Sequence, residues 1–173
     1  DQLAISYFKS FDLPVKIVRP FNTYGPRQSA RAIIPTVISQ LLNGNTSIKL
    51  GNLTPTRNLT YVTDTCKAFM EIYESDAFFG DVTNIGMNSE ISIGDLVSLI
   101  AKIMDTDITI SSANERIRPK SSEVERLVCD NTKLTNNTPW KPSYTLAEGI
   151  GEVIEWMKNP DNLNMYKSDQ YNV

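Results

Sequence analysis

Residues 19–28 read Arg-Pro-Phe-Asn-Thr-Tyr-Gly-Pro-Arg-Gln, and they directly follow residues 15–18, Val-Lys-Ile-Val. The β-branched residues of that run predict a short buried strand. Two prolines and a glycine predict a loop from Arg19 to Ser29, at the carboxyl end of the strand. Ligands of open α/β sheets bind at the carboxyl ends of strands. The stretch therefore indicates an α/β fold and the place where a binding site is expected.

Helical and strand patterns alternate on both sides of this stretch. Apolar spacing predicts helices at about 2–12, 34–42, 62–73, 93–104, 130–134 and 146–157, and strands at 15–18, 47–50, 59–62, 82–86 and 108–110. Asp64 is placed to cap or favour the start of the third helix, and Ser92 to cap the fourth. The helix at 146–157 is expected to be the last one.

The composition excludes several classes of protein. The 173 residues contain no histidine, which removes Ser-His-Asp hydrolases, Cys-His proteases and nearly all zinc catalysts, so no metal site is expected. The net charge of −3 gives no global positive field for nucleic acid or anionic lipid. Any site for an anion must therefore be built locally.

The cysteines and the apolar runs bear on the compartment. Cys66 and Cys129 are far apart, and Cys66 lies in a predicted helix, so a disulfide framework is not expected. No apolar run approaches the roughly 18 residues of a membrane span, and residues 1–3 resemble no signal peptide. We expect a cytoplasmic protein without a membrane segment.

Residues 19–26 resemble the Arg-x-x-Asn-x-Tyr-Gly-Pro strand end of the extended short-chain dehydrogenase/reductases, in particular the NAD-dependent nucleotide-sugar 4,6-dehydratases and 4-epimerases. Further segments resemble blocks of this family in the same order: 32–35, 56–64, 84–86, 118–119, 140–142 and 146–150. A chance match to one motif would not preserve that order. The sequence departs from the family at Asn58 and Leu59, where the block usually has Asp and Phe.

The resemblance implies a fold and a division of the chain. We expect the last strands of a Rossmann-type sheet plus a small mixed α/β substrate-binding lobe, within the carboxy-terminal part of one subunit. Rossmann-type pieces are expected at about 1–28 and 60–104, and the lobe at about 29–59 and 105–173.

The catalytic residues of the family are expected elsewhere. Residues 1–11 resemble the end of the helix that carries the family's Tyr-x-x-x-Lys pair. None of the seven tyrosines precedes a lysine by four positions. The catalytic tyrosine and lysine are therefore expected upstream of residue 1.

A diphosphate group needs planar guanidinium groups and amide donors around its oxygens. Arg57 and Arg118 are our choices for such a clamp, and the resemblance assigns both the same role. The resemblance also implies that Asn22 contacts the substrate phosphate or the backbone near the nicotinamide, and that Asn88 lies near the nucleotide. Ile34 is expected to contribute to the substrate site.

Other side chains near these blocks have simpler interpretations. Pro20 and Phe21 are expected to form the wall of the cofactor site beside Asn22. Tyr24 is interpreted as a turn residue, and Arg19 as a partner for a carboxylate. Packing or capping roles are expected for Tyr61, Asp64 and Trp140, and Glu123 could orient Arg118.

The resemblance implies a reaction and its partners. Bound NAD or NADP would take a hydride from C4 of a nucleotide-diphosphate sugar, and the 4-keto sugar would then lose water across C5 and C6 or be reduced on its other face. Residues 22–28 and 118–124 resemble the 4,6-dehydratases most. A 4-epimerase and a non-catalytic binding fragment remain alternatives. The intact enzyme is expected to be a homodimer.

Overall fold

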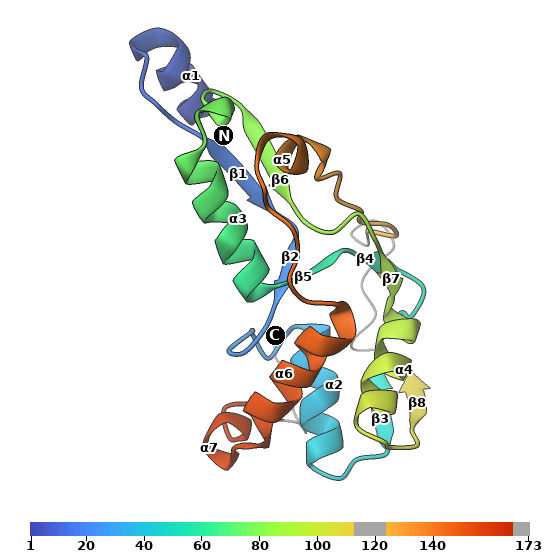
Figure 1. The fold of residues 1–173 in the computed structure, drawn as a ribbon. Helices are drawn as coiled ribbons and strands as arrows, with labels where there is room; N and C mark the ends of the chain where they lie inside the picture. The colour runs from blue at the N-terminus through green and yellow to red at the C-terminus, as the bar shows by residue number, and fades with distance from the viewer. Residues whose placement is uncertain (113–123, 168–173) are drawn as a thin grey trace. The chain divides into compact units, whose positions relative to one another are not determined.

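The computed structural model describes residues 1–112 and 124–167, and it has the mixed α/β composition expected from the sequence (Figure 1). The chain falls into two compact units. The first comprises residues 1–23, 58–90 and 128–143, and the second comprises 24–57, 91–127 and 144–173. Each unit is assembled from three separate stretches, so no single cut in the chain separates them.

The first unit is built on two parallel strands. β1 (Ile17–Pro20) and β6 (Val82–Ile85) pair in register along their whole length. The Phe21 N–H donates to the Ile85 carbonyl over 2.8 Å and continues the pairing past β1. Parallel strands need a long crossover connection, and α3 (Val62–Glu74) lies within it. The carboxyl ends of both strands consequently meet at one edge.

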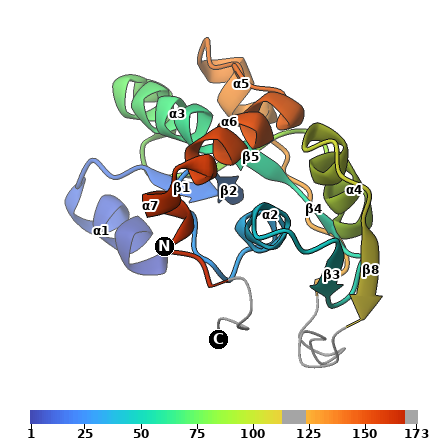
Figure 2. The ribbon, with the colours of Figure 1, turned by 90° about the horizontal axis from the view of Figure 1, so that it is seen from below.

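Helix α3 and helix α5 (Thr132–Asn137) contribute to the core of this unit. The buried cluster is made of Ala68, Ile72, Phe78 of the 3-10 helix Asp76–Phe78, Ile85, Leu134 and Trp140, with Val18 packed against it. Arg19 follows Val18 and points to the opposite face of the strand. There it pairs with Asp1, beside α1 (Gln2–Phe11), so β1 lies between α1 and α3 (Figure 2).

Lys16 stabilises the carboxyl end of α3. Its Nζ donates to the carbonyls of Ile72, Tyr73 and Ser75 over 2.9, 2.7 and 2.5 Å. It also lies 4.4 Å from the centroid of the Phe79 ring. The last carbonyls of a helix lack partners within the helix and form the negative end of its dipole. A cation there donates hydrogen bonds to these carbonyls and offsets the negative charge.

The prediction of a continuous loop from Arg19 to Ser29 is wrong. β1 extends to Pro20, and a further strand, β2 (Asn22–Tyr24), pairs with β5 (Leu59–Tyr61). Gly25 and Pro26 do lie in the bend and turn that follow Tyr24, whereas Pro20 ends β1. The partner of β2 lies far along the chain, so the local sequence carries no sign of this pairing.

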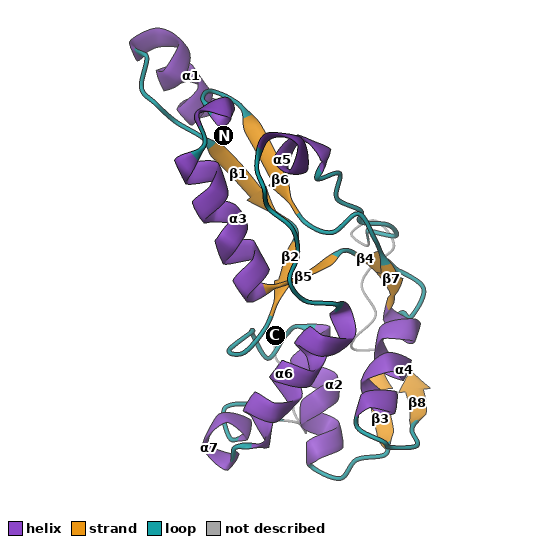
Figure 3. Cartoon of the chain, in the orientation of Figure 1, coloured by secondary structure: helices purple, strands orange, loops and turns teal. Residues whose placement is uncertain are grey.

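Three helices form the core of the second unit (Figure 3). They are α2 (Ile33–Leu42), α4 (Ile93–Ile103) and α6 (Leu146–Lys158), and each packs against the other two. Their buried apolar faces consist of Ile34, Val37, Ile38 and Leu41; Leu96, Val97 and Ile100; and Ile150, Val153, Ile154 and Met157. Helical spacing thus predicted the faces that meet.

Short strands flank these helices. β3 (Ser47–Leu50) runs parallel to β8 (Thr109–Ser112), and β4 (Thr56–Arg57) runs antiparallel to β7 (Ile91–Ser92). The predicted cap of α4 is confirmed, because the Ser92 hydroxyl accepts from the Asp95 N–H over 3.0 Å.

Two details of the predicted helices are wrong. A short helix, α7 (Pro160–Leu163), follows α6, which is therefore not the last one. α5 covers Thr132–Asn137 instead of 130–134, since the Asp130 carboxylate accepts from the Thr132 N–H ahead of the helix. Neither detail changes which apolar residues are buried.

The compact units differ from the expected division at two segments. α4 groups with the second unit because it packs on α2 and α6, whereas it was expected with the Rossmann-type pieces. Residues 128–143 group with the first unit because α5 packs on β6. Across residues 1–112 and 124–167, no helix combines the length and the apolar character needed to cross a membrane.

Replacing Lys16 tests how much its contacts stabilise the first unit. Lys16→Met is expected to lower the free energy of unfolding by about 1–2 kcal/mol, since charge-assisted hydrogen bonds to helix carbonyls are lost. Urea denaturation measures the change. Lys9→Met, at an exposed position of α1, is the matched control, and equal effects of the two substitutions would contradict the assignment.

Candidate functional site

The candidate site lies where β1 and β6 end. Pro20 is the last residue of β1, and Phe21 and Asn22 follow it. Gly86 and Asn88 come after the end of β6. The residues that the sequence assigned to a cofactor or nucleotide are thus brought to one edge of the parallel pair.

Asn58 connects the two strand ends. Its side chain is completely buried. The amide nitrogen donates to the Met87 carbonyl, and to the Ser89 carbonyl over 2.7 Å, while the amide oxygen accepts from the Met87 N–H over 3.0 Å. The Asn58 backbone carbonyl accepts from the Asn22 side-chain amide over 3.1 Å. One residue therefore fixes both Asn22 and the turn after β6.

Asn131 holds the same turn from another side. Its Nδ2 donates to the Gly86 carbonyl over 2.7 Å, and its backbone N–H donates to Oδ1 of Asn88 over 3.1 Å. The buried Oδ1 of Asn131 has no hydrogen-bond partner among the described residues. Asn22, Asn58, Asn88 and Asn131 together form what we call the asparagine cluster. Asn88 is its exposed member.

Gly86 allows the turn to approach its neighbours. A Cβ on Gly86 would lie 2.5 Å from Cβ of Cys129 and 2.6 Å from Oδ1 of Asn58. Real Cβ atoms do not approach other atoms so closely, so no larger residue fits without displacement. Burial, reinforced by the charge of Asp130, raises the pKa of the Cys129 thiol to about 11. Cys129 is therefore a packing group and not a nucleophile at neutral pH.

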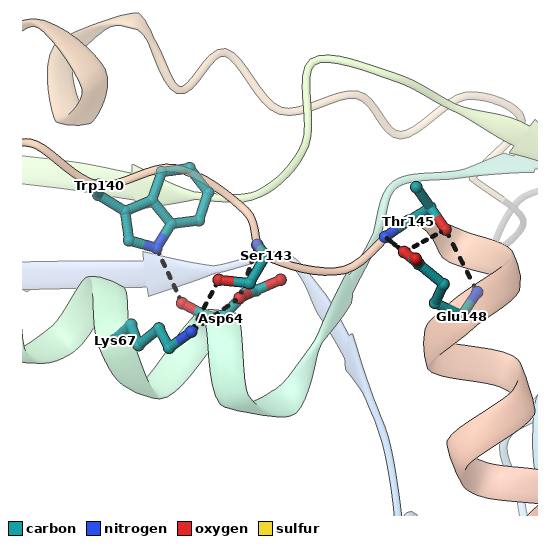
Figure 4. A network of polar contacts seen from close by, with 6 residues as sticks. All are labelled: Asp64, Lys67, Trp140, Ser143, Thr145 and Glu148. Atoms are coloured by element: carbon teal, nitrogen blue, oxygen red, sulfur yellow. Dashed lines mark hydrogen bonds and ion pairs between the residues drawn. The ribbon is translucent and has the colours of Figure 1, made fainter.

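A second polar network in the same unit centres on Asp64 (Figure 4). Its Oδ1 accepts from the Ser143 N–H over 3.0 Å, and its backbone carbonyl accepts from Nε1 of Trp140 over 2.9 Å. Nζ of Lys67 lies 3.9 Å from the same carboxylate oxygen and donates to the Ser143 hydroxyl over 2.7 Å. The network fastens the segment after α5 to the first turn of α3.

Asp64 was expected to cap or favour the start of α3, but its carboxylate instead binds the Ser143 N–H. The N-cap of α3 is Tyr61, whose side chain makes no capping hydrogen bond to the helix, and Asp64 is a buried member of the first turn. The expected packing roles of Trp140 and Tyr61 are confirmed by their burial. Figure 4 also shows Thr145 and Glu148, which form the capping box of α6 in the second unit.

Arg57 and Ile34 belong to the second unit. Nη1 of Arg57 donates to the carbonyls of Thr56 and Val124 over 2.8 and 2.7 Å, which holds the half-buried guanidinium against the backbone. Ile34 is 1% exposed and lies in the core face of α2. Arg118 and Glu123 lie outside the described residues, so the proposed pairing of Arg57 and Arg118 stays a prediction.

Two neighbouring interpretations can be compared with the structure. Arg19 pairs with the Asp1 carboxylate, with its Nε 2.7 Å from Oδ2, as expected for a partner of a carboxylate. Tyr24 is buried at the end of β2, and its hydroxyl donates to the Leu146 carbonyl over 3.3 Å. Tyr24 thus has a structural role, as a core residue and not as part of a turn.

Two members of the asparagine cluster are hard to recognise from the sequence. Asn58 differs from the residue usual in the family's block, and Asn131 lies in no block that resembles the family. The position of Asn58 inside a largely apolar block is itself an indication, because a buried polar residue has to satisfy its hydrogen bonds. The partners of that residue could not have been named, since they lie on a distant turn.

Comparison with known proteins places this arrangement in a class. The crystal structure of dTDP-glucose 4,6-dehydratase from Bacillus anthracis in complex with NAD is 28% identical, with a TM-score of 0.80 over 93% of this chain and 50% of that one. UDP-glucuronic acid 4-epimerase from Bacillus cereus, in complex with UDP-glucuronic acid and NAD, is 27% identical, with a TM-score of 0.80 over 91% and 49%. The chain has the fold of the nucleotide-sugar dehydratases and epimerases.

The family follows from the sequence comparison. The family model described as GDP-mannose 4,6 dehydratase matches residues 1–153, and the chain belongs to this family. The human dTDP-D-glucose 4,6-dehydratase is 30% identical over 166 residues, which are 94% of this chain and 46% of that protein. The resemblance read from the motifs is confirmed. The chain spans about half the length of the curated relatives it matches.

Gly86→Ala tests the close packing beneath the asparagine cluster. The new methyl group must displace Cys129 or Asn58, so the free energy of unfolding should fall by about 1–3 kcal/mol. The Cys129 thiol should also react faster with a disulfide reagent, while the exposed Cys66 serves as an internal reference.

Gly94→Ala is the matched control. A Cβ there would come no closer than 3.6 Å to the nearest atom, an ordinary contact. An unchanged rate for Cys129 in Gly86→Ala would show that the turn yields in another direction and would contradict the packing described above.

Proposed function

We propose that the chain is the carboxy-terminal part of an NAD(P)-dependent nucleotide-sugar 4,6-dehydratase and supplies its substrate-binding lobe. The observation that carries this proposal is the convergence of Asn22 and Asn88 at the carboxyl ends of β1 and β6, held there by Asn58 and Asn131. Neutral amides at strand ends suit a nucleotide ligand, because they donate and accept without a charge of their own.

The described residues fit part of a nicotinamide cofactor. A carboxamide group needs a hydrogen-bond acceptor for its N–H groups and a donor for its oxygen. The backbone and side-chain amides after β1 include both donors and acceptors. Pro20, Phe21 and Asn22 would hold that end of NAD or NADP. When bound, the cofactor supplies the hydride acceptor and donor of the reaction.

The residues of this chain would bind and orient the sugar nucleotide. Arg57 and Arg118 would bind the diphosphate with planar, permanently charged groups, and Asn88 would contact the nucleotide. Ile34 would contribute to the substrate site through the helix it anchors. Proton transfer would come from a tyrosine and a lysine outside these 173 residues, which contain no Tyr-x-x-x-Lys. On this proposal the chain alone has no dehydratase activity.

A nucleotide-sugar 4-epimerase is the second candidate. The Bacillus cereus epimerase matches this chain about as well as the Bacillus anthracis dehydratase does. The products distinguish the two activities in the intact enzyme. A dehydratase gives a 4-keto product lighter by one water, whereas an epimerase gives an isomer of unchanged mass. After incubation with dTDP-glucose and UDP-glucose, mass spectrometry detects the loss of water, and chromatography that separates C4 epimers detects the isomer. If neither product forms, the non-catalytic binding fragment is supported.

The proposal includes a cytoplasmic homodimer and the division into Rossmann-type pieces and a substrate lobe. Both cysteines are free, which suits a reducing compartment. Leu3, Tyr7 and Phe11 of α1 are exposed apolar side chains on one helix, as an interface helix would present. Sedimentation of the intact enzyme tests the dimer.

Arg57→Ala tests the proposed diphosphate contact in the chain itself. The affinity for dTDP-glucose, measured by calorimetry, should fall about tenfold or more, since a hydrogen bond to a charged group contributes about 1.5–3 kcal/mol. Arg57→Lys should recover part of the loss, because it keeps the charge without the planar fork.

The control for this prediction is Lys102→Ala, which removes an exposed cation of the same unit from the last turn of α4. The melting temperature of each variant separates loss of binding from loss of folding. Binding of Arg57→Ala with the affinity of the unsubstituted chain would rule out the proposed contact.

A further inference from the structure

We propose that Asn58 is a positioning residue whose neutral amide fixes the turn 86–89 and the Asn22 amide in the arrangement that receives the ligand. This inference rests on the proposed function for its ligand. It adds a residue that touches neither cofactor nor substrate and acts through two residues that do. Its physical basis is the pattern of donors and acceptors around one buried side chain.

The surroundings of Asn58 require both a donor and an acceptor. Two carbonyl oxygens, of Met87 and Ser89, face its Nδ2, and the Met87 N–H faces its Oδ1. A carboxylate has only acceptors and a methyl group has neither function. Ionised aspartate, the residue that the family's block usually has here, would leave the Met87 and Ser89 carbonyls of this chain without a donor. In this chain, asparagine is therefore the residue of this shape that satisfies all three backbone groups at once.

Burial makes this requirement strict. Asn58 is 0% exposed, so water does not replace a lost partner. A carboxylate at this position would lose its hydration and face two carbonyl oxygens, and both effects raise the pKa of a carboxyl group. Protonation would restore one donor, so such a variant should regain the native turn in acid.

The position of Asn58 couples both ligand-facing residues. Its side chain holds the turn that carries Asn88, and its backbone carbonyl holds the side chain of Asn22. Without the side-chain amide, as in an alanine variant, the turn between Gly86 and Ser89 loses three hydrogen bonds, while the bonds of Asn131 to Gly86 and Asn88 remain. The two residues should therefore be displaced together.

Between pH 5 and 7, the titration of the new carboxyl group has to be distinguished from that of the chain's own groups. The sequence contains no histidine. Beside the turn, Cys129 has a pKa raised to about 11 by burial, and hydrogen bonds from Thr132 lower the pKa of Asp130, so neither changes its charge in that range. Glu90, which follows the turn directly, is present in every variant. A transition seen in Asn58→Asp and not in the unsubstituted chain therefore belongs to the new carboxyl group.

The experiment compares Asn58→Asp, Asn58→Ala and the unsubstituted chain at pH 5 and pH 7. Amide hydrogen exchange of Met87, corrected for the intrinsic effect of pH, reports on the turn without any ligand. Asn58→Asp keeps an acceptor for the Met87 N–H but loses both bonds from Nδ2, so the turn should open more often and Met87 should exchange about tenfold faster at pH 7, which corresponds to about 1.4 kcal/mol. At pH 5 the exchange should return toward that of the unsubstituted chain. Asn58→Ala should exchange faster at both values.

Asn136→Asp makes the same chemical change at an exposed position of α5 in the same unit and should show no pH-dependent exchange of Met87. Affinities for NAD⁺ and dTDP-glucose are measured in parallel. A merely structural role would lower the melting temperature and leave the affinity of the folded chain unchanged. A positioning role lowers the affinity of Asn58→Asp about tenfold at pH 7 and restores it at pH 5.

The outcomes separate the two proposals. Exchange of Asn58→Asp that matches the unsubstituted chain at pH 7 overturns the role of Asn58. An opened turn with unchanged affinity also overturns it, because the turn then does not position the ligand. If the unsubstituted chain binds neither NAD⁺ nor dTDP-glucose, the proposed function fails and the ligand part of this inference fails with it, while the exchange data still decide whether Asn58 fixes the turn.

Discussion

A buried amide with three backbone partners is the constraint on which the candidate site depends. Burying a polar side chain costs free energy unless its hydrogen bonds are made, so Asn58 can occupy its position only when the turn after β6 presents its carbonyls and N–H correctly. The folded position of one side chain and the course of a distant turn are thus specified together. Gly86 completes the constraint, because only glycine lets the turn come this close.

The parallel pairing of β1 and β6 brings the residues that Asn58 holds to the same end of the two strands. Two parallel strands end at the same edge, so the residues after them become neighbours although more than sixty positions separate Asn22 from Asn88. α3 is the crossover helix between them, and its buried residues complete the core beneath the strands. Lys16 and Asp64 fix the two ends of that helix.

Local patterns were enough to predict most of the elements. The apolar spacing of α2, α4 and α6 predicted the helices, because helical periodicity is a property of consecutive residues, and their apolar residues form the faces that are buried. β2 was missed because its partner β5 is remote in sequence, and two prolines nearby favoured a loop. Asp64 shows the same limitation. A carboxylate in a first helical turn resembles a cap, whereas its partner, the Ser143 N–H, comes from a segment that no local pattern connects to α3.

For the candidate site, the family resemblance pointed to Asn22 and Asn88, and their contact with a ligand stays a prediction. The structure brings both to the carboxyl ends of β1 and β6. The roles of Asn131 and Asn58 come from contacts between segments that are distant in sequence and meet only in the folded chain. Ile34 illustrates the converse, since a residue chosen for the substrate site is a core residue of α2. It would act on a ligand by placing the helix.

The chemistry of the described site points to binding and orientation as the work of this chain. A proton-transfer group has to change its charge near neutral pH. The chain has no histidine, burial keeps the Cys129 thiol protonated, and hydrogen bonds keep the Asp130 carboxyl ionised. What remains at the strand ends is a set of neutral amides, whose hydrogen bonding does not change with pH. On the proposal above, the acid and base would belong to residues outside this chain, and the asparagine cluster would hold the ligand in a way that does not depend on pH.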